Sequence, residues 1–342
     1  MNQLQQTVLP RWRGFNLLGA FVMNSPGRFS EDDFRITSDL GFDFVRLPLN
    51  YTFWIDDNDP FKINENKLEF LDEAIRWGER YGLHIQMNFH RAPGYSVAGD
   101  RIEPFDLWKD ASAQAALNIH WAVISKRYQD IGADRLSFNL INEPHDVDKE
   151  THNRILLPVV DNVLAHNPDR LIILDGLDWG TKPNDGLVLC DNSDDKDKHR
   201  QIAQSCRAYA PHPFTHYKAE WADPDPNQEE PSWPYVSQYN ARDQWDEARL
   251  YREFERWARF AVEKDIGIHC GEGGVYKHTP HKAVLAWLDA TLSVLKQFNI
   301  GFSLWNLHGP FGILDSQRAD VDYVDYHGHR LDSEMLNLLQ KY

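Results

Sequence analysis

Residues 67–89 read KLEFLDEAIRWGERYGLHIQMNF and contain the two kinds of element from which the fold is predicted. In Lys67–Tyr81, apolar residues recur at intervals of three and four, which is the period of an amphipathic helix. In Leu83–Phe89, a short and mainly apolar run is typical of a buried strand. This stretch therefore predicts a helix that leads directly into a strand covered on both faces.

The same alternation of apolar run and amphipathic stretch recurs along the whole chain. The predicted strands are Trp12–Leu18, Phe42–Leu47, Leu83–Phe89, Leu136–Ile141, Leu171–Leu174, Ile202–Tyr209, Ile266–Cys270 and Gly301–Trp305. The predicted helices are Ser30–Leu40, Lys67–Tyr81, Ala111–Tyr128, Thr151–His166, Asp246–Lys264 and His281–Phe298. Apolar strands that alternate with helices indicate an α/β protein with a parallel sheet covered on both faces. Eight such strands favour a closed (β/α)8 TIM barrel.

The domain organisation follows from the length and from the absence of internal boundaries. A (β/α)8 barrel takes roughly 250 residues before loop insertions, so the 342 residues of this chain fit one barrel. No repeat, low-complexity linker or sharp change of composition divides the chain, and we expect one catalytic domain over residues 1–342. The turn Leu18–Phe21 lacks the GxGxxG pattern of dinucleotide-binding sheets. Residues 175–200 contain no clear long helix.

One loop is unusually long and aromatic. Residues 218–239 are acidic and rich in proline, and they contain Trp221, Trp233 and Tyr235. A long loop at the carboxyl-terminal rim of a barrel often acts as a lid or as a wall of the substrate site. The alternative is a surface excursion held in place by its aromatic side chains.

Composition narrows the class of ligand. The formal net charge is −16, with 52 acidic against 36 basic residues. This charge repels nucleic-acid phosphates and anionic lipids, so we expect neither nucleic acid nor membrane as a partner. The 12 Trp, 13 Tyr and 18 Phe either form an aromatic core or partly line a cleft in which sugar faces stack on rings. A neutral ligand is the favoured interpretation.

The amino-terminal sequence gives an expectation about localisation. Residues 1–8 read MNQLQQTV and lack a basic segment followed by an apolar run, which is the pattern of a secretory signal. No apolar stretch approaches the roughly 20 residues that span a bilayer. As written, the chain is expected to be cytoplasmic. A chain from which a signal had been removed would read the same way and would be secreted.

Two acidic residues stand directly at predicted strand ends, where a barrel carries its function. Glu143 follows the fourth strand and precedes Pro144, which cannot extend a strand ladder, and Glu272 follows the seventh strand among three glycines. Each alone could be a solvated loop acid. Strands four and seven lie on opposite sides of an eight-stranded barrel, so both side chains can point across its mouth. Acetal hydrolysis needs such a pair, with retention at a carboxyl separation of roughly 5–5.5 Å and inversion at a wider one.

These residues and others resemble glycoside hydrolase family 5, the cellulase and mannanase family of clan A. The Asn142-Glu143-Pro144 tripeptide matches the family signature, whose Glu is the acid/base, and Cys270–Gly273 resembles the motif around the nucleophile, here Glu272. Further matches, from about residue 14 to residue 306, are Gly14–Leu17, Val45–Pro48, Asn88–Arg91, Ala92–Tyr95 and Ser303–Asn306. The resemblance implies a (β/α)8 barrel that hydrolyses β-glycosides with retention, without a cofactor and without a metal in its site.

The resemblance also assigns substrate-binding roles. Arg46 would hydrogen-bond Glu272, Asn142 would hold the 2-hydroxyl of the sugar, and His90 would bind sugar hydroxyls. Trp305 would form the floor of the subsite at the cleavage point. Taken singly, Arg46 and His90 could instead be structural partners of backbone carbonyls at the barrel end.

One departure from the family pattern occurs at the sixth strand. The family usually has His-x-Tyr there, and its Tyr hydroxyl contacts the nucleophile. This chain has Arg207-Ala208-Tyr209, so an Arg replaces the His, and His212 or His216 could supply the imidazole instead. We count Arg207, Tyr209 and His216 among the expected substrate-binding residues. The Arg could favour an unusual substrate, reshape the aglycone side or weaken the catalyst.

Three functions therefore remain open. The first is a retaining O-glycosyl hydrolase that acts on neutral β-linked oligosaccharides or polysaccharides, most simply β-1,4-linked gluco- or manno-configured ones, from within the chain or from its end. The second is a catalytically weakened carbohydrate-binding barrel, which Arg207 suggests. The third is a metal-dependent barrel hydrolase, which the 15 His suggest although the first strand lacks His-x-His.

Overall fold

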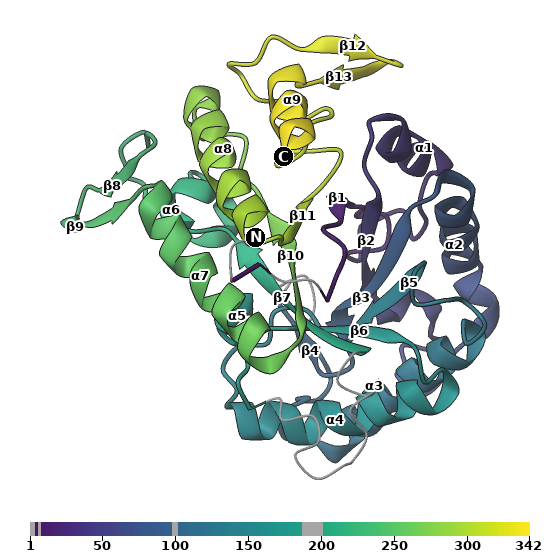
Figure 1. Ribbon diagram of the computed structural model, residues 1–342. Coiled ribbons are helices and arrows are strands. Elements are labelled where there is room, and N and C mark those ends of the chain that lie inside the picture. Colours follow the sequence, from purple (N-terminus) through teal and green to yellow (C-terminus); the bar gives the residue numbers. More distant parts are fainter. Residues whose placement is uncertain (1–3, 6–7, 98–101, 187–200) are drawn as a thin grey trace. The chain divides into compact units, whose positions relative to one another are not determined.

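The computed structural model describes residues 4–5, 8–97, 102–186 and 201–342 (Figure 1). The described residues form two units that are each compact in themselves. We call residues Leu17–Cys206 with Asp265–Gly267 the N-terminal unit. We call Arg207–Lys264 and Ile268–Tyr342, with the described residues up to Asn16, the C-terminal unit.

Parallel strands that pair in chain order form the sheet of the N-terminal unit. They are β2 (Phe44–Asn50), β3 (His84–Ala92), β5 (Leu136–Asn139), β6 (Leu171–Asp175) and the first part of β7 (Ile202–Ala208). A two-residue strand, β4 (Tyr95–Ser96), turns back antiparallel onto the end of β3. All residues of these parallel strands are buried, as expected for a parallel sheet with both faces covered.

Four helices accompany these strands. They are α1 (Glu31–Asp39), α2 (Glu69–Tyr81), α3 (Ala111–Arg127) and α4 (Lys149–His166). Helix α1 packs beside α2, and α3 packs beside α4 (Figure 1). A Cβ at Gly78 of α2 would lie 2.6 Å from the side chain of Ile85 in β3, so the glycine lets the helix approach the strand closely. The short elements are η1 (Tyr51–Trp54), η2 (Glu65–Leu68) and α5 (Leu177–Gly180).

The C-terminal unit contains the parallel strands β1 (Arg13–Asn16) and β11 (Gly301–Leu304), and all of β10 (Gly267–Gly273) except its first residue. Strand β11 pairs with both of the others. Its long helices are α7 (Glu247–Lys264) and α8 (His281–Gln297), which pack together, and α9 (Ser333–Lys341), which packs on α8 (Figure 1). Two short helices are α6 (His212–Thr215) and η4 (Glu220–Ala222). One antiparallel hairpin consists of β8 (Tyr235–Ser237) and β9 (Asn240–Trp245). A second consists of β12 (Val324–Tyr326) and β13 (His329–Leu331).

The predicted loop 218–239 contains η4 and β8. Its Trp233 and Tyr235 rings pack against Phe214 of α6, with centroids 5.5 and 6.2 Å away. Trp221 of the same loop is 62% exposed. The aromatic side chains thus hold one part of the loop in place, while a role as lid or subsite wall stays a prediction.

The eight predicted strands all occur, as β1, β2, β3, β5, β6, β7, β10 and β11, and the six predicted helices occur between them. Helix α9 and both hairpins were not predicted from the sequence. Between β6 and β7 the structure describes only α5, and residues 187–200 of the weakly patterned stretch 175–200 lie outside the described residues. Among the described residues, no helix combines the length and the apolar character needed to cross a bilayer.

Candidate active site

The backbone of Glu143 is fixed on both sides. Glu143 follows β5 with a φ of 47°, a left-handed conformation that is uncommon outside glycine. Its N–H donates to Oδ2 of Asp175 at 2.8 Å, and its carbonyl accepts from the hydroxyl of Tyr95 at 2.6 Å. The same Tyr95 oxygen accepts the N–H of His145 at 3.1 Å. Strained backbone persists where its surroundings determine it, and these three contacts do so here.

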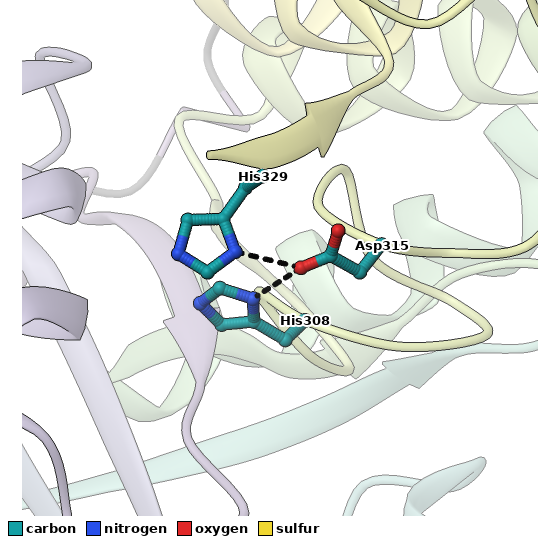
Figure 2. A group of neighbouring side chains, drawn as sticks. All are labelled: His308, Asp315 and His329. Carbon is teal, nitrogen blue, oxygen red and sulfur yellow. Dashed lines mark hydrogen bonds and ion pairs between the residues drawn. The ribbon is translucent and has the colours of Figure 1, made fainter. Parts of the chain in front are cut away.

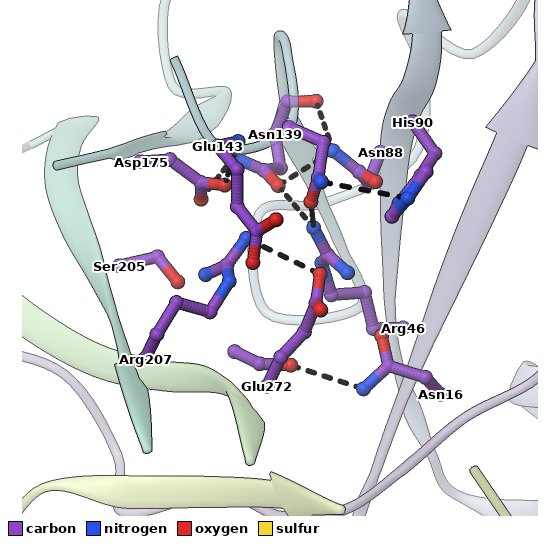
Figure 3. A network of polar contacts seen from close by, with 12 residues as sticks. Asn16, Arg46, Asn88, His90, Asn139, Glu143, Asp175, Ser205, Arg207 and Glu272 are labelled. Carbon is purple, nitrogen blue, oxygen red and sulfur yellow. Dashed lines mark hydrogen bonds and ion pairs between the residues drawn. The ribbon is translucent and has the colours of Figure 1, made fainter. Parts of the chain in front are cut away.

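A buried network of polar side chains lies beside this turn (Figure 3). Oδ1 of Asn139 accepts from Arg46 Nη2 at 2.9 Å and from Asn88 Nδ2 at 2.7 Å. Nδ2 of Asn139 donates to Oδ1 of Asp175 at 3.0 Å. Arg46 Nη2 also donates to Oδ1 of Asn142 at 2.8 Å. The network joins β2, β3, β5 and β6, so it fixes the residues around Glu143 relative to the sheet.

His90 completes the set of predicted residues in the N-terminal unit. Its Nε2 lies 3.5 Å from Nδ2 of Asn142, and its ring packs edge-on against Phe21 with centroids 4.5 Å apart. Arg46, His90, Asn142 and Glu143 therefore all lie in or beside this network. The sugar contacts of Asn142 and His90, and the contact between Arg46 and Glu272, stay predictions.

Glu272 is the centre of a second cluster, in the C-terminal unit. Nη2 of Arg207 lies 3.2 Å from Oε1 of Glu272, and their side chains are 2% and 3% exposed (Figure 3). The hydroxyl of Tyr209 donates to Oε2 at 3.3 Å. Arg207 is the second-last residue of β7 and Tyr209 directly follows the strand, so their side chains point to the same side. The Arg that departs from the family pattern is thus an ion-pair partner of Glu272.

The backbone at Glu272 is shaped by a bulge and a glycine. Between Cys270 and Gly273 the pairing of β10 with β11 shifts, because three residues on β10 span two on β11. Bulges of this kind re-aim side chains next to active sites. A Cβ on Gly273 would lie 2.6 Å from Phe302 and 2.7 Å from Ala208, so the glycine allows β10 to fit between its neighbours.

His216 and Trp305 are both placed near this cluster. The ring of His216 lies 5.2 Å from that of Tyr209 and stacks on His212 at 4.1 Å. Burial, and to a lesser extent the neighbouring His212, lower the pKa of His216 to about 3, which favours a neutral imidazole. The N–H of Trp305 donates to the carbonyl of Gly273 at 2.8 Å, directly after Glu272. Their sugar contacts stay predictions.

Three residues at this site were not predicted. Asp175 is the last residue of β6, one position beyond the predicted strand. An acid at a strand end could have identified it as a site residue. Tyr95 lay in a matched family segment but had no assigned role. Trp179 stacks on His145 with centroids 4.5 Å apart and planes 10° apart, and it is 49% exposed. No periodicity marks Trp179, because it stands in a short turn with a φ of 57°.

One group of side chains among the described residues has the composition of a metal site (Figure 2). Oδ2 of Asp315 lies 3.4 Å from Nδ1 of His308 and 2.7 Å from Nδ1 of His329. Burial raises the pKa of Asp315, but the N–H of Arg330 and the two imidazoles lower it more, so the net direction is down. The 2.7 Å contact has the length of a normal N–H···O hydrogen bond, and the 3.4 Å contact is longer than that.

Known proteins resemble this chain over most of its length. A family model described as Cellulase (glycosyl hydrolase family 5) matches residues 2–310. Endoglucanase C of Acetivibrio thermocellus is 24% identical over 330 residues, which cover 91% of each chain. Cellodextrinase A of Ruminococcus flavefaciens is 26% identical over 274 residues, which cover 79% of this chain and 76% of the relative.

Solved structures of similar fold superpose on nearly the whole chain. A crystal structure of a glycoside hydrolase superposes with a TM-score of 0.88 at 31% identity, covering 97% of this chain and 99% of the other. Thermotoga maritima Cel5A in complex with mannotriose superposes with a TM-score of 0.76 at 20% identity, covering 96% and 97%. The predicted fold class, a (β/α)8 TIM barrel, is confirmed.

Proposed function

Because the chain belongs to glycosyl hydrolase family 5 and is a β-glycoside hydrolase, we propose that it works with retention, with Glu272 as nucleophile and Glu143 as acid/base. The observation that carries the proposal is the setting of Glu272. Both of its oxygens are contacted, Oε1 by the Arg207 guanidinium and Oε2 by the Tyr209 hydroxyl. Such contacts suit a carboxylate that attacks an electrophilic carbon rather than an acid that must release a proton.

In the first step, one oxygen of Glu272 bonds to the anomeric carbon while the bond from that carbon to the glycosidic oxygen breaks. Glu143 transfers its proton to the departing oxygen, and the aglycone leaves as an alcohol. In the second step, water bonds to the anomeric carbon and returns its proton to Glu143. The carbon–oxygen bond to Glu272 breaks, which restores both carboxyl groups and releases a sugar of unchanged anomeric configuration. The two carboxyl groups are expected to lie roughly 5–5.5 Å apart.

The turn that carries Glu143 supports its part. Because Asp175 and Tyr95 hold the peptide groups on both sides of Glu143, its carboxyl starts from a fixed backbone. A preorganised acid loses little freedom on reaching the transition state, and this is worth several kcal/mol in well-oriented reactions.

We propose a neutral β-linked oligosaccharide or polysaccharide as substrate, with gluco- or manno-configured units. Relatives are named endoglucanase and cellodextrinase, and structural neighbours are described in complex with mannotriose or cellobiose. The half-exposed Trp179 beside the Glu143 turn offers a flat face on which a sugar ring can stack. The net charge of −16 suits a substrate without negative charge.

The second candidate is a carbohydrate-binding barrel with weakened catalysis. One observation favours it: the residue that replaces the family's His, Arg207, forms an ion pair with the proposed nucleophile Glu272.

The test is hydrolysis of β-gluco-, β-manno- and β-xylo-oligosaccharides by the wild type, by Glu272→Ala and by Glu143→Ala, with the anomer of the first product followed by NMR. We expect turnover with retention by the wild type and a loss of roughly 10⁴-fold or more in Glu272→Ala. Equal activity in the wild type and Glu272→Ala would exclude Glu272 as nucleophile, and an inverted first product would exclude retention. Binding without cleavage across the panel would favour the second candidate.

A further inference from the structure

We propose that Arg207 is a positioning residue whose fixed positive charge speeds the second chemical step, the release of the sugar from Glu272. The proposal rests on the proposed function, in which Glu272 is the nucleophile. It assigns a catalytic purpose to the one motif residue that departs from the family pattern.

The ion pair between Arg207 and Glu272 is short and buried. Arg207 Nη2 lies 3.2 Å from Glu272 Oε1, and the two side chains are 2% and 3% exposed. In such surroundings a charge–charge interaction is screened far less than at a surface. Any change in the charge of Glu272 during the reaction is therefore felt strongly by the guanidinium.

Tyr209 contacts the second carboxylate oxygen of Glu272 and so helps to fix the orientation of the carboxylate. Tyr209 donates its hydroxyl to Oε2, and its own backbone carbonyl accepts from Thr215 Oγ1 at 2.6 Å. With Arg207 on one oxygen and Tyr209 on the other, the plane of the carboxylate is set from both sides. Arg207 therefore both orients Glu272 and places a positive charge beside it.

The kind of residue matters because an imidazole and a guanidinium differ in charge. A His in this place is neutral or charged according to pH, whereas an Arg is always charged in proteins. The Arg207 charge is thus present throughout the catalytic cycle. His216, the imidazole near Tyr209, is neutral because burial lowers its pKa to about 3.

The two chemical steps respond to this charge in opposite ways. In the first step Glu272 loses its negative charge as its oxygen bonds to the anomeric carbon, so a neighbouring cation favours the starting state. In the second step the same bond breaks and the negative charge returns to Glu272, so the cation favours the transition state. Removal of the charge should slow the second step selectively, and the glycosyl-enzyme should then accumulate.

The experiment uses 2,4-dinitrophenyl β-cellobioside, whose good leaving group makes the first step fast. Release of dinitrophenol is followed by stopped flow and in the steady state for the wild type, Arg207→Met and Arg207→Lys. We expect Arg207→Met to lower kcat on the order of 100-fold. KM should fall at least as much as kcat, so that kcat/KM, which reports the first step, stays the same or rises, and a burst close to one equivalent should appear. Arg207→Lys keeps the charge and should recover most of kcat.

A matched control is Arg170→Met, which removes another buried guanidinium. Arg170 donates to the backbone carbonyls of Leu136 at 2.6 Å and Tyr128 at 2.9 Å, and its loss should lower the melting temperature without changing kcat or KM. Where Arg207→Met does not fold, as judged by circular dichroism, Arg207→Gln carries the same test.

The outcomes separate this proposal from the proposed function. If kcat and kcat/KM fall together in Arg207→Met without a burst, Arg207 has a purely structural role and the proposal is overturned. The wild type is also treated with 2,4-dinitrophenyl 2-deoxy-2-fluoro-β-cellobioside, and the labelled peptide is identified by mass spectrometry. A label on Glu272 supports the proposed function whatever Arg207 does. A label elsewhere overturns the assignment of Glu272 and, with it, the proposal for Arg207.

Discussion

Asp175 holds the backbone of Glu143 with one carboxylate oxygen and the side chain of Asn139 with the other. Oδ2 accepts the Glu143 N–H at 2.8 Å, and Oδ1 accepts from Asn139 Nδ2 at 3.0 Å. The acid at the end of β6 is therefore part of the support of the proposed acid/base. Both of its oxygens are used, so an amide cannot replace it without loss.

Asp175→Asn should lower catalytic efficiency. The amide has one acceptor oxygen and places an NH2 group against one of the two N–H donors, which leaves a buried donor unpaired at a cost of about 1–3 kcal/mol. We expect kcat/KM to fall by roughly 10- to 100-fold. Asp72→Asn is a suitable control, since Asp72 pairs with Arg127 at 2.6 Å on helices α2 and α3 and should affect stability alone. A lowered melting temperature with unchanged kcat/KM in Asp175→Asn would show that Asp175 has no positioning role.

Trp179→Ala should weaken binding more than chemistry. The indole is 49% exposed and stacked on His145, two residues beyond Glu143, so it can form one face of a sugar subsite. An aromatic stacking contact is worth about 0.5–1.5 kcal/mol beyond its area. KM for cellotetraose or mannotetraose should therefore rise roughly 2- to 10-fold with kcat little changed. Trp179→Phe should keep most of the affinity, and equal KM in Trp179→Ala and the wild type would exclude the stacking role.

Stability should fall on acidification because buried histidines must become charged. Burial lowers the pKa of His120 to about 4, where Nδ1 accepts from Trp54 Nε1 at 2.9 Å and Nε2 faces the carbonyl of Pro60 at 2.8 Å. The unfolded chain binds this proton near pH 6.5 and the folded chain only near pH 4, so stability is lost as pH falls through that window. By pH 4.5 the loss from this one group is roughly 2–3 kcal/mol.

Urea unfolding of His120→Gln at pH 7 and pH 4.5 measures this loss. The variant is less stable at pH 7, but its further loss on acidification should be smaller than that of the wild type by the amount given above. His327→Gln, at an exposed position, should leave the pH dependence unchanged. Parallel curves for His120→Gln and the wild type would show that His120 is not the group that titrates.

Hydrolysis should not depend on a divalent metal. The proposed chemistry uses two carboxyl groups, and Asp315 already accepts hydrogen bonds from His308 and His329. Exhaustive dialysis against EDTA should leave kcat and KM within experimental error. Loss of activity that zinc or another divalent ion restores would instead support the metal-dependent hydrolase, and His329→Gln would then show whether this cluster holds the ion.

The strands and long helices could be predicted because burial on both faces leaves a simple pattern. Every residue of β3 is buried, and four apolar residues in Leu83–Phe89 were enough to predict the strand that leads to His90. Helix α2 ends at Tyr81, the residue predicted from the periodicity, and Gly82 follows it with a left-handed φ of 66°. Helix α9 and the β12–β13 hairpin follow the eighth strand and fall outside the barrel repeat that guided the prediction.

The sequence predicted only those site residues whose type and position are unusual in themselves. Glu143 and Glu272 stood out because acids at strand ends have few structural reasons to be there. The partner of Arg207 did not stand out, since it depends on the direction of two side chains from different strands. Tyr95 acts through its hydroxyl on the backbone of Glu143, and sequence patterns do not show which backbone groups a side chain reaches.

The bulge in β10 determines which mutations the segment around Glu272 can tolerate. One extra residue between Cys270 and Gly273 resets the odd–even alternation of the strand, so the direction of Glu272 depends on a count of residues rather than on the identity of its neighbours. Substitutions leave that parity intact. The loss of a single residue from this segment would reverse it, and no change of side chain could then restore the direction of the carboxylate.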